Sequence, residues 1–408
     1  LEIRGSQLTV DRLDTAPYVT LRGAKAAGAA GGSGFAQLSG RGVTMLINML
    51  ELDVRANRMW SDGAGRATLL VTRDLEGQAS PTPFPLELTW QGGLNFDGST
   101  MLFDRDVVVA GADDTLRCDR LLTKLNTKII FGETIDQKAI DVSDVLCDGR
   151  VTINHVSRDA GGVISHERVQ LAALTMNQQT GAISGTGPGV IRSTRYGSSL
   201  AMLGGTQNPP AASPDAAGSK LNFLRVDFQE GLTGNMITRE LTFHKKVRAV
   251  YGPVDAWEQE LDGAQPELLP PDAMTMTCDV MRINEDPVAA RTTPVGPDGQ
   301  KRMVGPIQFT ATGNVQIDGQ VPKQGAFTAL AERATYEQAK DAFILEGSGR
   351  TPATLRRAGQ TGSPPAAGRI RYVPSANNGR GSVEVDDIQY IEITPQDINN
   401  ARRPKAVR

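Results

Sequence analysis

The side chains that most often carry out chemistry in proteins are few and scattered in this sequence. The sulfur and imidazole groups that could bind a metal or act as nucleophiles are Cys118, Cys147, Cys278, His155, His166 and His244. A zinc site needs such ligands at close, recurring spacings, and no Cys-x-x-Cys pair occurs here. The sequence therefore predicts no metal site.

Catalysis requires titratable groups that converge on one place. The sequence contains neither Gly-x-Ser-x-Gly nor His-Glu-x-x-His. Asp113-Asp114 and Asp386-Asp387 are adjacent carboxylates, but neighbouring residues on a strand point to opposite faces, so we interpret them as turn and strand-end residues. Gly185-Thr186-Gly187 lacks the following helix that a phosphate-binding loop needs. We expect no catalytic residue and no cofactor. A carbohydrate-active β-helix enzyme remains an alternative, because its acidic residues can lie on a strand face without a motif.

Composition favours many thin strands over one thick core. The chain has 408 residues, of which 44 are glycine, and aromatic residues make up only 5%. Its length suits two or three domains or one repeat array. The formal net charge of −3 gives no electrostatic reason to expect a nucleic-acid partner. No run of eighteen apolar residues is present, so we expect no membrane-spanning helix.

The stretch 307–357 carries the clearest structural signal. Phe309, Ala311, Val315 and Ile317 alternate with polar residues on either side of Gly313-Asn314. A second run alternates at Phe327, Ala329 and Ala331 before Tyr336, and a third alternates at Phe343 and Leu345 before Gly347. Alternation with period two, punctuated by Gly and Asp-Gly, predicts short antiparallel strands.

These three strands also resemble one repeat of a known family. A Gly-Asn-Val-x-Ile strand at 313–317, an Ala-x-x-Ala-x-Tyr strand at 331–336 and a Leu-x-Gly strand end at 345–347 follow in the order typical of the OstA-like (organic-solvent-tolerance) family. That family includes the LptA-type periplasmic bridge and the N-terminal domain of the LptD-type translocon. The resemblance implies an all-β, elongated antiparallel β-jelly-roll or β-taco, whose apolar interior carries lipopolysaccharide and whose ends join head to tail.

The alternating strands recur along the chain. Leu52 to Arg58, Leu116 to Arg120 and Met274 to Asp279 share with Phe327 to Arg333 a pattern of large apolar residues followed by Ala or Cys. Cys118 and Cys278 take matching places, which predicts small buried side chains rather than redox groups. The residues that we expect to face a lipid-binding interior are Val315, Ile317, Phe327, Ala329, Ala331, Phe343, Leu345, Leu52, Val54, Ala56, Leu116, Cys118, Met274, Met276 and Cys278. The first seven follow from the resemblance and the others from the repeat.

Proline-rich and small-residue stretches divide the expected array. We expect a first segment at 1–78, a linker at 79–85, a second segment at 86–203, a flexible linker at 204–220, a C-terminal segment at 221–395 and a tail at 396–408. Within these segments, 43–59 and 256–261 are expected to be strands. Asp148-Gly149 is expected to form a hairpin turn, and 266–271 a spacer.

Three functions remain open from the sequence. An apolar trough would shelter acyl chains at ~0.8 kcal/mol per buried methylene, so a lipid or lipopolysaccharide-like amphiphile is the expected partner of a non-enzymatic protein. A structural or surface scaffold that assembles by strand-edge contacts, with a closed core and no lipid, is the alternative. The β-helix enzyme is the third. The resemblance implies the periplasm and cell envelope of a Gram-negative-type bacterium, although the chain lacks a signal peptide and begins at Leu1, like a mature chain or a fragment.

Overall fold

The protein is all-β, as the alternating runs predict. The computed structural model describes residues 2–12, 16–23, 34–40, 42–73, 79–133, 141–159, 162–196, 221–285, 307–321, 325–337, 340, 342–357, 360–365, 368–373, 382–385 and 390–393. Over these residues the secondary structure consists mainly of antiparallel strands, and Pro266–Leu268 forms a short 3-10 turn. None of the described helical segments has the length and hydropathy needed to cross a membrane.

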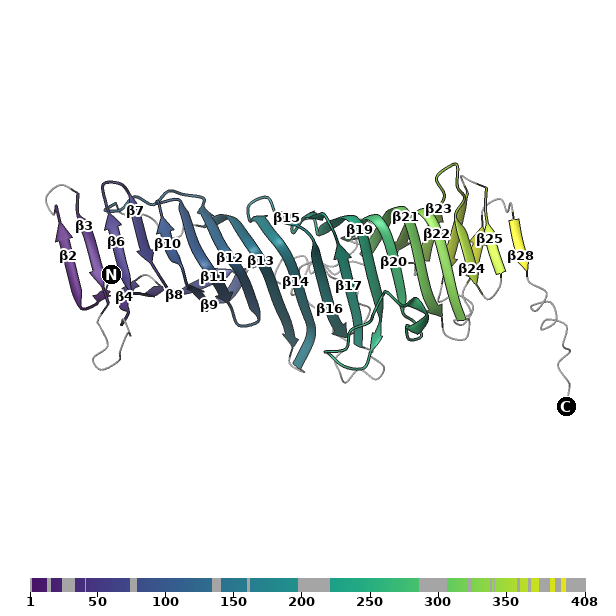
Figure 1. Cartoon of the computed structure of the whole chain (residues 1–408), viewed down its shortest axis with the longest axis horizontal. Coiled ribbons are helices and arrows are strands. Elements are labelled where there is room, and N and C mark those ends of the chain that lie inside the picture. The colour runs from purple at the N-terminus through teal and green to yellow at the C-terminus, as the bar shows by residue number, and fades with distance from the viewer. Residues whose placement is uncertain are drawn as a thin grey trace. The chain divides into compact units, whose positions relative to one another are not determined.

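The chain, whose strands are labelled in Figure 1, forms two compact units. Unit 1 comprises Leu1–Val156 and Arg168–Gly187, and unit 2 comprises Ser157–Glu167 and Pro188–Arg408. The strands of unit 1 are β1 (Glu2–Arg4), β2 (Gln7–Asp11), β3 (Tyr18–Arg22), β4 (Ala36–Gly40), β5 (Val43–Ile47), β6 (Met49–Asp53), β7 (Arg58–Asp62), β8 (Gly65–Arg73), β9 (Ala79–Trp90), β10 (Gly93–Phe96), β11 (Thr100–Ala110), β12 (Asp114–Leu125) and β15 (Ala182–Thr186). Residues of β13 (Val142–Asp159) and β14 (Gly162–Asn177) belong to both units.

Unit 2 contains the remaining strands. They are β16 (Gly189–Tyr196), β17 (Leu221–Phe228), β18 (Gly231–Asn235), β19 (Glu240–Val254), β20 (Met274–Glu285), β21 (Ile307–Val321), β22 (Gly325–Glu337), β23 (Ala342–Glu346), β24 (Thr354–Arg357), β25 (Gln360–Ser363), β26 (Arg369–Val373), β27 (Ser382–Val385) and β28 (Tyr390–Ile393). Figure 1 shows β19, β20, β21 and β22 as neighbouring strands, and their registers confirm antiparallel pairing throughout.

Unit 1 is built of two layers that meet at a corner. One layer pairs β1, β4, β5, β8 and β9 in that order, and the other pairs β2, β3, β6, β7 and β10. Strand β11 belongs to both, because Met101–Asp104 pairs with β10 whereas Val108–Ala110 pairs with β9. The chain crosses from one layer to the other at the corner, at short breaks such as Asn48 and Gln91–Gly92. It reverses direction within a layer at the edge opposite the corner, and we call this edge the mouth.

Unit 2 repeats this plan. Strand β19 pairs with β18 through Glu240–His244 and with β17 through Arg248–Val254. Strand β22 likewise pairs with β23 through Arg333–Glu337 and with β24 through Phe327–Leu330. Strands β26 and β27 extend the β23 layer, and β25 and β28 extend the β24 layer. Among the described strands of unit 2, backbone pairing joins the two layers only through strands that bend at the corner.

Bulges bend the long strands. Residues with positive φ lie in β11 (Arg105 and Asp106), in β19 (Lys245 and Lys246) and in β21 (Gly313 and Asn314). In each bulge, two residues face a single residue of the next strand, so the bulged strand has one extra residue. A bulge bends its strand, and here the exposed Arg105 and Asp106 separate the buried Phe103 from the buried Val107.

Several local expectations were wrong. Strand β6 ends at Asp53, and 54–57 forms a turn rather than the continuation of a strand. Residues 79–85 are not a linker but the start of β9, where Phe84 and Pro85 pair with β8. Asp148-Gly149 makes no hairpin, because it lies at the corner within β13.

The expected strand at 256–261 is an irregular segment. Of the expected segments, 1–78 and most of 86–203 fall within unit 1, whereas 221–395 falls within unit 2. The expected linker 204–220 and tail 396–408 lie outside the described residues.

Candidate functional site

The candidate site is the apolar space between the two layers of each unit, which we call the inner space. In unit 2 the register aligns Met276 with Ile317 and Ile317 with Ala329, so one face of three strands is lined by these side chains. Facing them from the other layer, Leu345 pairs with Ala334 on the inner side of β22 and β23. The lining is apolar because every second residue on each half-strand is apolar.

Most predicted lining residues are buried there. The buried ones are Val315, Ile317, Phe327, Ala329, Phe343, Leu345, Leu116, Cys118, Met276 and Cys278. Ala331, Met274, Leu52 and Val54 are partly exposed, and Ala56 is exposed. Val54 and Ala56 were misplaced because the turn after β6 breaks the alternation on which their assignment depended.

Aromatic side chains bridge the inner space from layer to layer. In unit 1, Trp90 of β9 lies 5.1 Å, between ring centroids, from Phe103 in the other layer. In unit 2, Phe327 of β22 and Tyr372 of β26 approach to 6.0 Å across the layers. Trp90 is fully buried. In this conformation the protein's own side chains therefore fill much of the space between the layers.

Three polar side chains within this lining have no hydrogen-bond partner among the residues that the structure describes. They are Trp90 through Nε1, Ser61 through Oγ and Ser193 through Oγ, and all three residues are buried. Their registers with Gly65, Leu94 and Leu224 place them on the inner faces. A buried donor without an acceptor costs free energy, so such groups call for a water molecule or a ligand.

The corner that β11, β12 and β13 form in unit 1 recurs, residue by residue, in β19, β20 and β21 of unit 2. Cys118 and Cys278 take matching places, as the sequence repeat predicted, because each pairs with a valine, Val107 or Val247. Each cysteine is followed by an aspartate that faces a glycine on the next strand. A Cβ added at Gly149 would lie 2.3 Å from Asp119 Oδ2, and one added at Gly313 would lie 2.4 Å from Asp279 Oδ2.

The side chain of the residue after each glycine donates a hydrogen bond to that aspartate. Arg150 donates to Asp119 through Nε at 2.9 Å and also through Nη2, whereas Asn314 donates through Nδ2 to Asp279 at 2.9 Å. The hydrogen bond from Arg150 lowers the pKa of the Asp119 carboxyl. This corner interaction was missed from the sequence, and its signal was the recurrence of Cys-Asp and then Gly with a polar donor.

The structure brings Cys118 and Cys147 together, which the sequence did not suggest. The two buried thiols hydrogen-bond to each other across β12 and β13, and Cys278 has no such partner among the described residues. The hydrogen bond from Cys147 lowers the pKa of Cys118, and the same bond together with burial raises the pKa of Cys147. Burial, together with the nearby charge of Asp279, raises the pKa of Cys278 to about 12.

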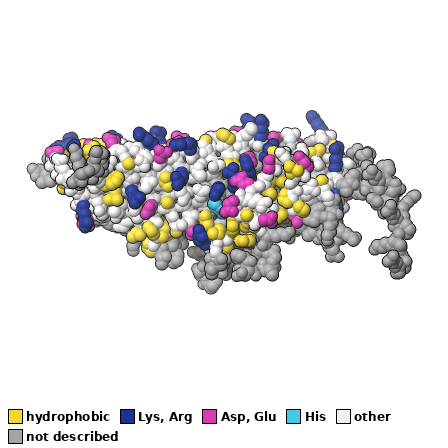
Figure 2. Space-filling view, turned by 60° about the horizontal axis from the view of Figure 1, so that its bottom comes forward, with side chains coloured by type: hydrophobic (Ala, Val, Ile, Leu, Met, Phe, Trp, Pro, Cys, Tyr) yellow, Lys and Arg dark blue, Asp and Glu magenta, His cyan; other side chains and the backbone are white. Residues whose placement is uncertain are grey.

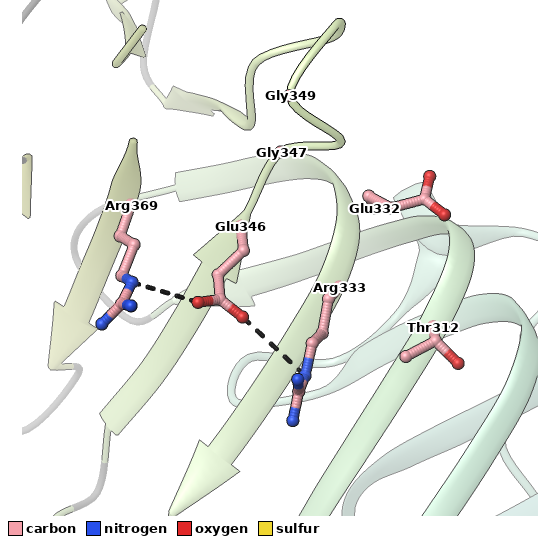
Figure 3. Close-up of a pocket in the computed structure, with 7 residues that line it drawn as sticks. All are labelled: Thr312, Glu332, Arg333, Glu346, Gly347, Gly349 and Arg369. Carbon is pink, nitrogen blue, oxygen red and sulfur yellow. Dashed lines mark ion pairs between the residues drawn. The ribbon is translucent and has the colours of Figure 1, made fainter. Parts of the chain in front are cut away.

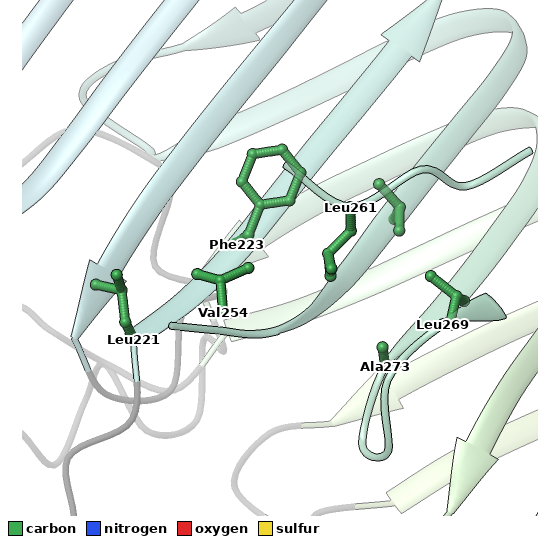
Figure 4. Packing of buried hydrophobic residues seen from close by; sticks show 7 residues of the cluster. Leu221, Phe223, Val254, Leu261, Leu269 and Ala273 are labelled. Carbon is green, nitrogen blue, oxygen red and sulfur yellow. The ribbon is translucent and has the colours of Figure 1, made fainter. Parts of the chain in front are cut away.

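A second apolar cluster lies on the outer face of unit 2 (Figure 4). Residues 255–273 fold back over β17 and β19, and Leu261 and Leu269 pack with Phe223, Val250 and Val254. Trp257 and Tyr196 close its rim with their rings 5.4 Å apart. The stretch 266–271, which we expected to be a spacer, is therefore part of the segment 255–273 that covers β17 and β19, because Leu269 is buried.

A depression of about 450 Å³ lies on the outer face near the corner of unit 2 (Figure 3). Glu346 lies between two guanidinium groups there, 3.8 Å from Arg333 and 3.1 Å from Arg369. Both arginines are more than half exposed, at 54% and 63%. These charges already neutralise one another in part and face water.

Two of the titratable residues that the sequence singled out can be placed in the described structure, and two cannot. Asp114, expected in a turn, begins β12 and lies 2.5 Å from His155 Nδ1 on β13. Within the described ranges, no group of three His, Cys, Asp or Glu side chains is placed to hold a metal ion. Asp386 and Asp387 lie outside the described residues.

Comparison with known proteins identifies no relative. The sequence matches no protein-family model, and neither the curated proteins nor the solved structures yield a match.

Proposed function

We propose that this protein binds the acyl chains of a lipid, of lipopolysaccharide type, in the inner space between its layers, and that it transforms no substrate. The observation that carries the proposal is the architecture of the inner space. Two layers with apolar inner faces meet along one corner, and in unit 2 the described strand pairs leave the mouth without backbone hydrogen bonds between layers. Separating the layers at the mouth would admit a chain without breaking a strand pair.

Burial supplies the driving force for such binding. Each methylene moved from water into the apolar inner space contributes ~0.8 kcal/mol. Alanines such as Ala311, Ala329 and Ala334 keep the lining thin, so a chain can lie against the backbone between larger side chains. The aromatic contacts between layers must yield as the chain enters, and their loss offsets part of this gain.

The unpartnered donors favour an acylated amphiphile over a plain hydrocarbon. The indole N–H of Trp90 and the hydroxyl groups of Ser61 and Ser193 can each donate to a carbonyl oxygen. Ester and amide links in acylated lipids provide such oxygens beside their chains. The same proposal places the protein in a bacterial envelope, where such lipids move between membranes.

A scaffold with a closed core is the second candidate. It is favoured by the near-complete burial of inner side chains such as Ile317, Leu345 and Ile370. In that case the inner space is a permanent core, and the exposed strand edges or surfaces carry the function.

Tryptophan fluorescence separates the two candidates. The three tryptophans are Trp60, Trp90 and Trp257, and Trp90 lies in the inner space whereas Trp257 lies on the outer cluster. A variant with Trp60→Phe and Trp257→Phe reports on Trp90 alone, and one with Trp60→Phe and Trp90→Phe reports on Trp257. Stearic acid with a nitroxide on its chain should quench Trp90 saturably and leave Trp257 bright. Equal quenching of both would indicate surface adsorption, and no quenching of Trp90 would support a closed core in unit 1.

A further inference from the structure

The corner of unit 1 contains a pair of free thiols, Cys118 and Cys147. Cys118 pairs with Val107 of β11, and Cys147 pairs with Leu121 of β12, so both side chains point to the inner face. Both are buried, at 5% and 2% exposure. Their sulfur atoms meet in a hydrogen bond across the bulge that separates the pairs Arg117–Thr152 and Arg120–Asp148.

We propose that Cys118 and Cys147 are the site of a disulfide that fastens β12 to β13 at the corner. The oxidant is a small-molecule disulfide such as oxidised glutathione. One cysteine thiolate attacks it and releases one small thiol, and the second cysteine attacks the mixed disulfide and releases another. The cysteines lose two protons and two electrons, and the reagent is reduced to two thiols. Because the folded pair is buried, the exchange takes place while the chain folds.

The repeated corner in unit 2 shows what this pair adds. Cys278 takes the place of Cys118, but Ala311 takes the place of Cys147, because Ala311 pairs with Met281 as Cys147 pairs with Leu121. Unit 2 thus has the same bend with one thiol, and the described structure gives that thiol no sulfur partner. The bend itself does not need two cysteines, so the bend does not explain why Cys147 stands at the unit 1 corner.

Peptide mapping tests the bond. The full chain is refolded in a mixture of reduced and oxidised glutathione, quenched in acid, unfolded in urea at mildly acidic pH with N-ethylmaleimide present to alkylate free thiols, and digested. We expect a linked peptide that contains Cys118 and Cys147, with Cys278 alkylated. Alkylation of all three cysteines, or links that involve Cys278, would overturn the proposal. The oxidised protein should also melt about 5 °C or more above the Cys118→Ser variant, since the bond closes a loop of roughly 30 residues.

Two variants serve as controls. Cys278→Ser should keep the linked peptide, which rules out a bond that depends on the third thiol. Ala311→Cys should create a link between positions 278 and 311, because those positions match the pair in unit 1. If position 311 stays unlinked in a variant whose circular dichroism matches the parent, the match between corners does not set the thiol geometry, and the proposal loses its basis.

Discussion

The corner glycines give the sharpest test of the fold. Gly149 has a φ of +73°, and a Cβ there would lie 2.3 Å from Asp119 Oδ2 and 2.8 Å from Asp119 Cβ. Gly149→Ala therefore combines two costs. The left-handed backbone costs a residue with a Cβ about 1–2 kcal/mol, and the contact with Asp119 adds about 1–2 kcal/mol of overpacking because Asp119 Cβ, not only a mobile oxygen, must move. The free energy of unfolding of unit 1 should fall by about 2–4 kcal/mol.

The chain contains a matched control for the backbone cost. Gly132 also has a positive φ, +95°, but nothing lies within 4 Å of a Cβ placed there. Gly132→Ala should lower the free energy of unfolding by only about 1–2 kcal/mol. The free energy of unfolding of both variants is measured by urea unfolding, with amide hydrogen exchange in β12 and β13 as the readout. If Gly149→Ala costs no more than Gly132→Ala, the close approach of Asp119 is not a constraint on the corner, and the reasoning fails.

Two further predictions concern the charges and the outer cluster. Arg150 holds the pKa of Asp119 below its usual range. The stabilisation that Arg150→Gln removes should therefore be present at neutral pH and should vanish as the pH falls through the folded pKa of Asp119. A difference in urea midpoint between parent and variant that grows toward pH 3 would contradict this. Leu261→Ala should destabilise unit 2 by about 2–3 kcal/mol and open 255–273 to protease, because Leu261 is buried against Phe223 and Val250. Cleavage at the parent rate would show that this segment does not depend on the cluster.

The sequence predicted the strands better than their bends. Alternation at Phe327, Ala329 and Ala331 correctly indicated a strand, and the match of Cys118 with Cys278 is confirmed by the registers. Gly149, by contrast, was assigned to a hairpin turn. Left-handed glycines serve both turns and bulges, so local sequence does not distinguish a chain that reverses from a strand that bends.

Long-range features of the site could not be predicted in the same way. Cys118 and Cys147 meet only because two strands align across a bulge, and their separation along the chain gave no spacing signal. The cover formed by 255–273 was also missed, since Leu261 and Leu269 are isolated apolar residues among polar and proline residues. Which face of a sheet such residues reach depends on the chain's return path, and that path is fixed by packing.

Native mass spectrometry of the purified full chain, before and after incubation with an acylated glycolipid, tests the central claim most directly. We expect a species heavier than the polypeptide by the mass of the lipid, and we expect the indole of Trp90 to lose its emission when the bound lipid has a nitroxide on its acyl chain. If the chain keeps the bare polypeptide mass at every lipid concentration, with Trp90 unquenched, the inner space is a closed core and the proposed function is wrong.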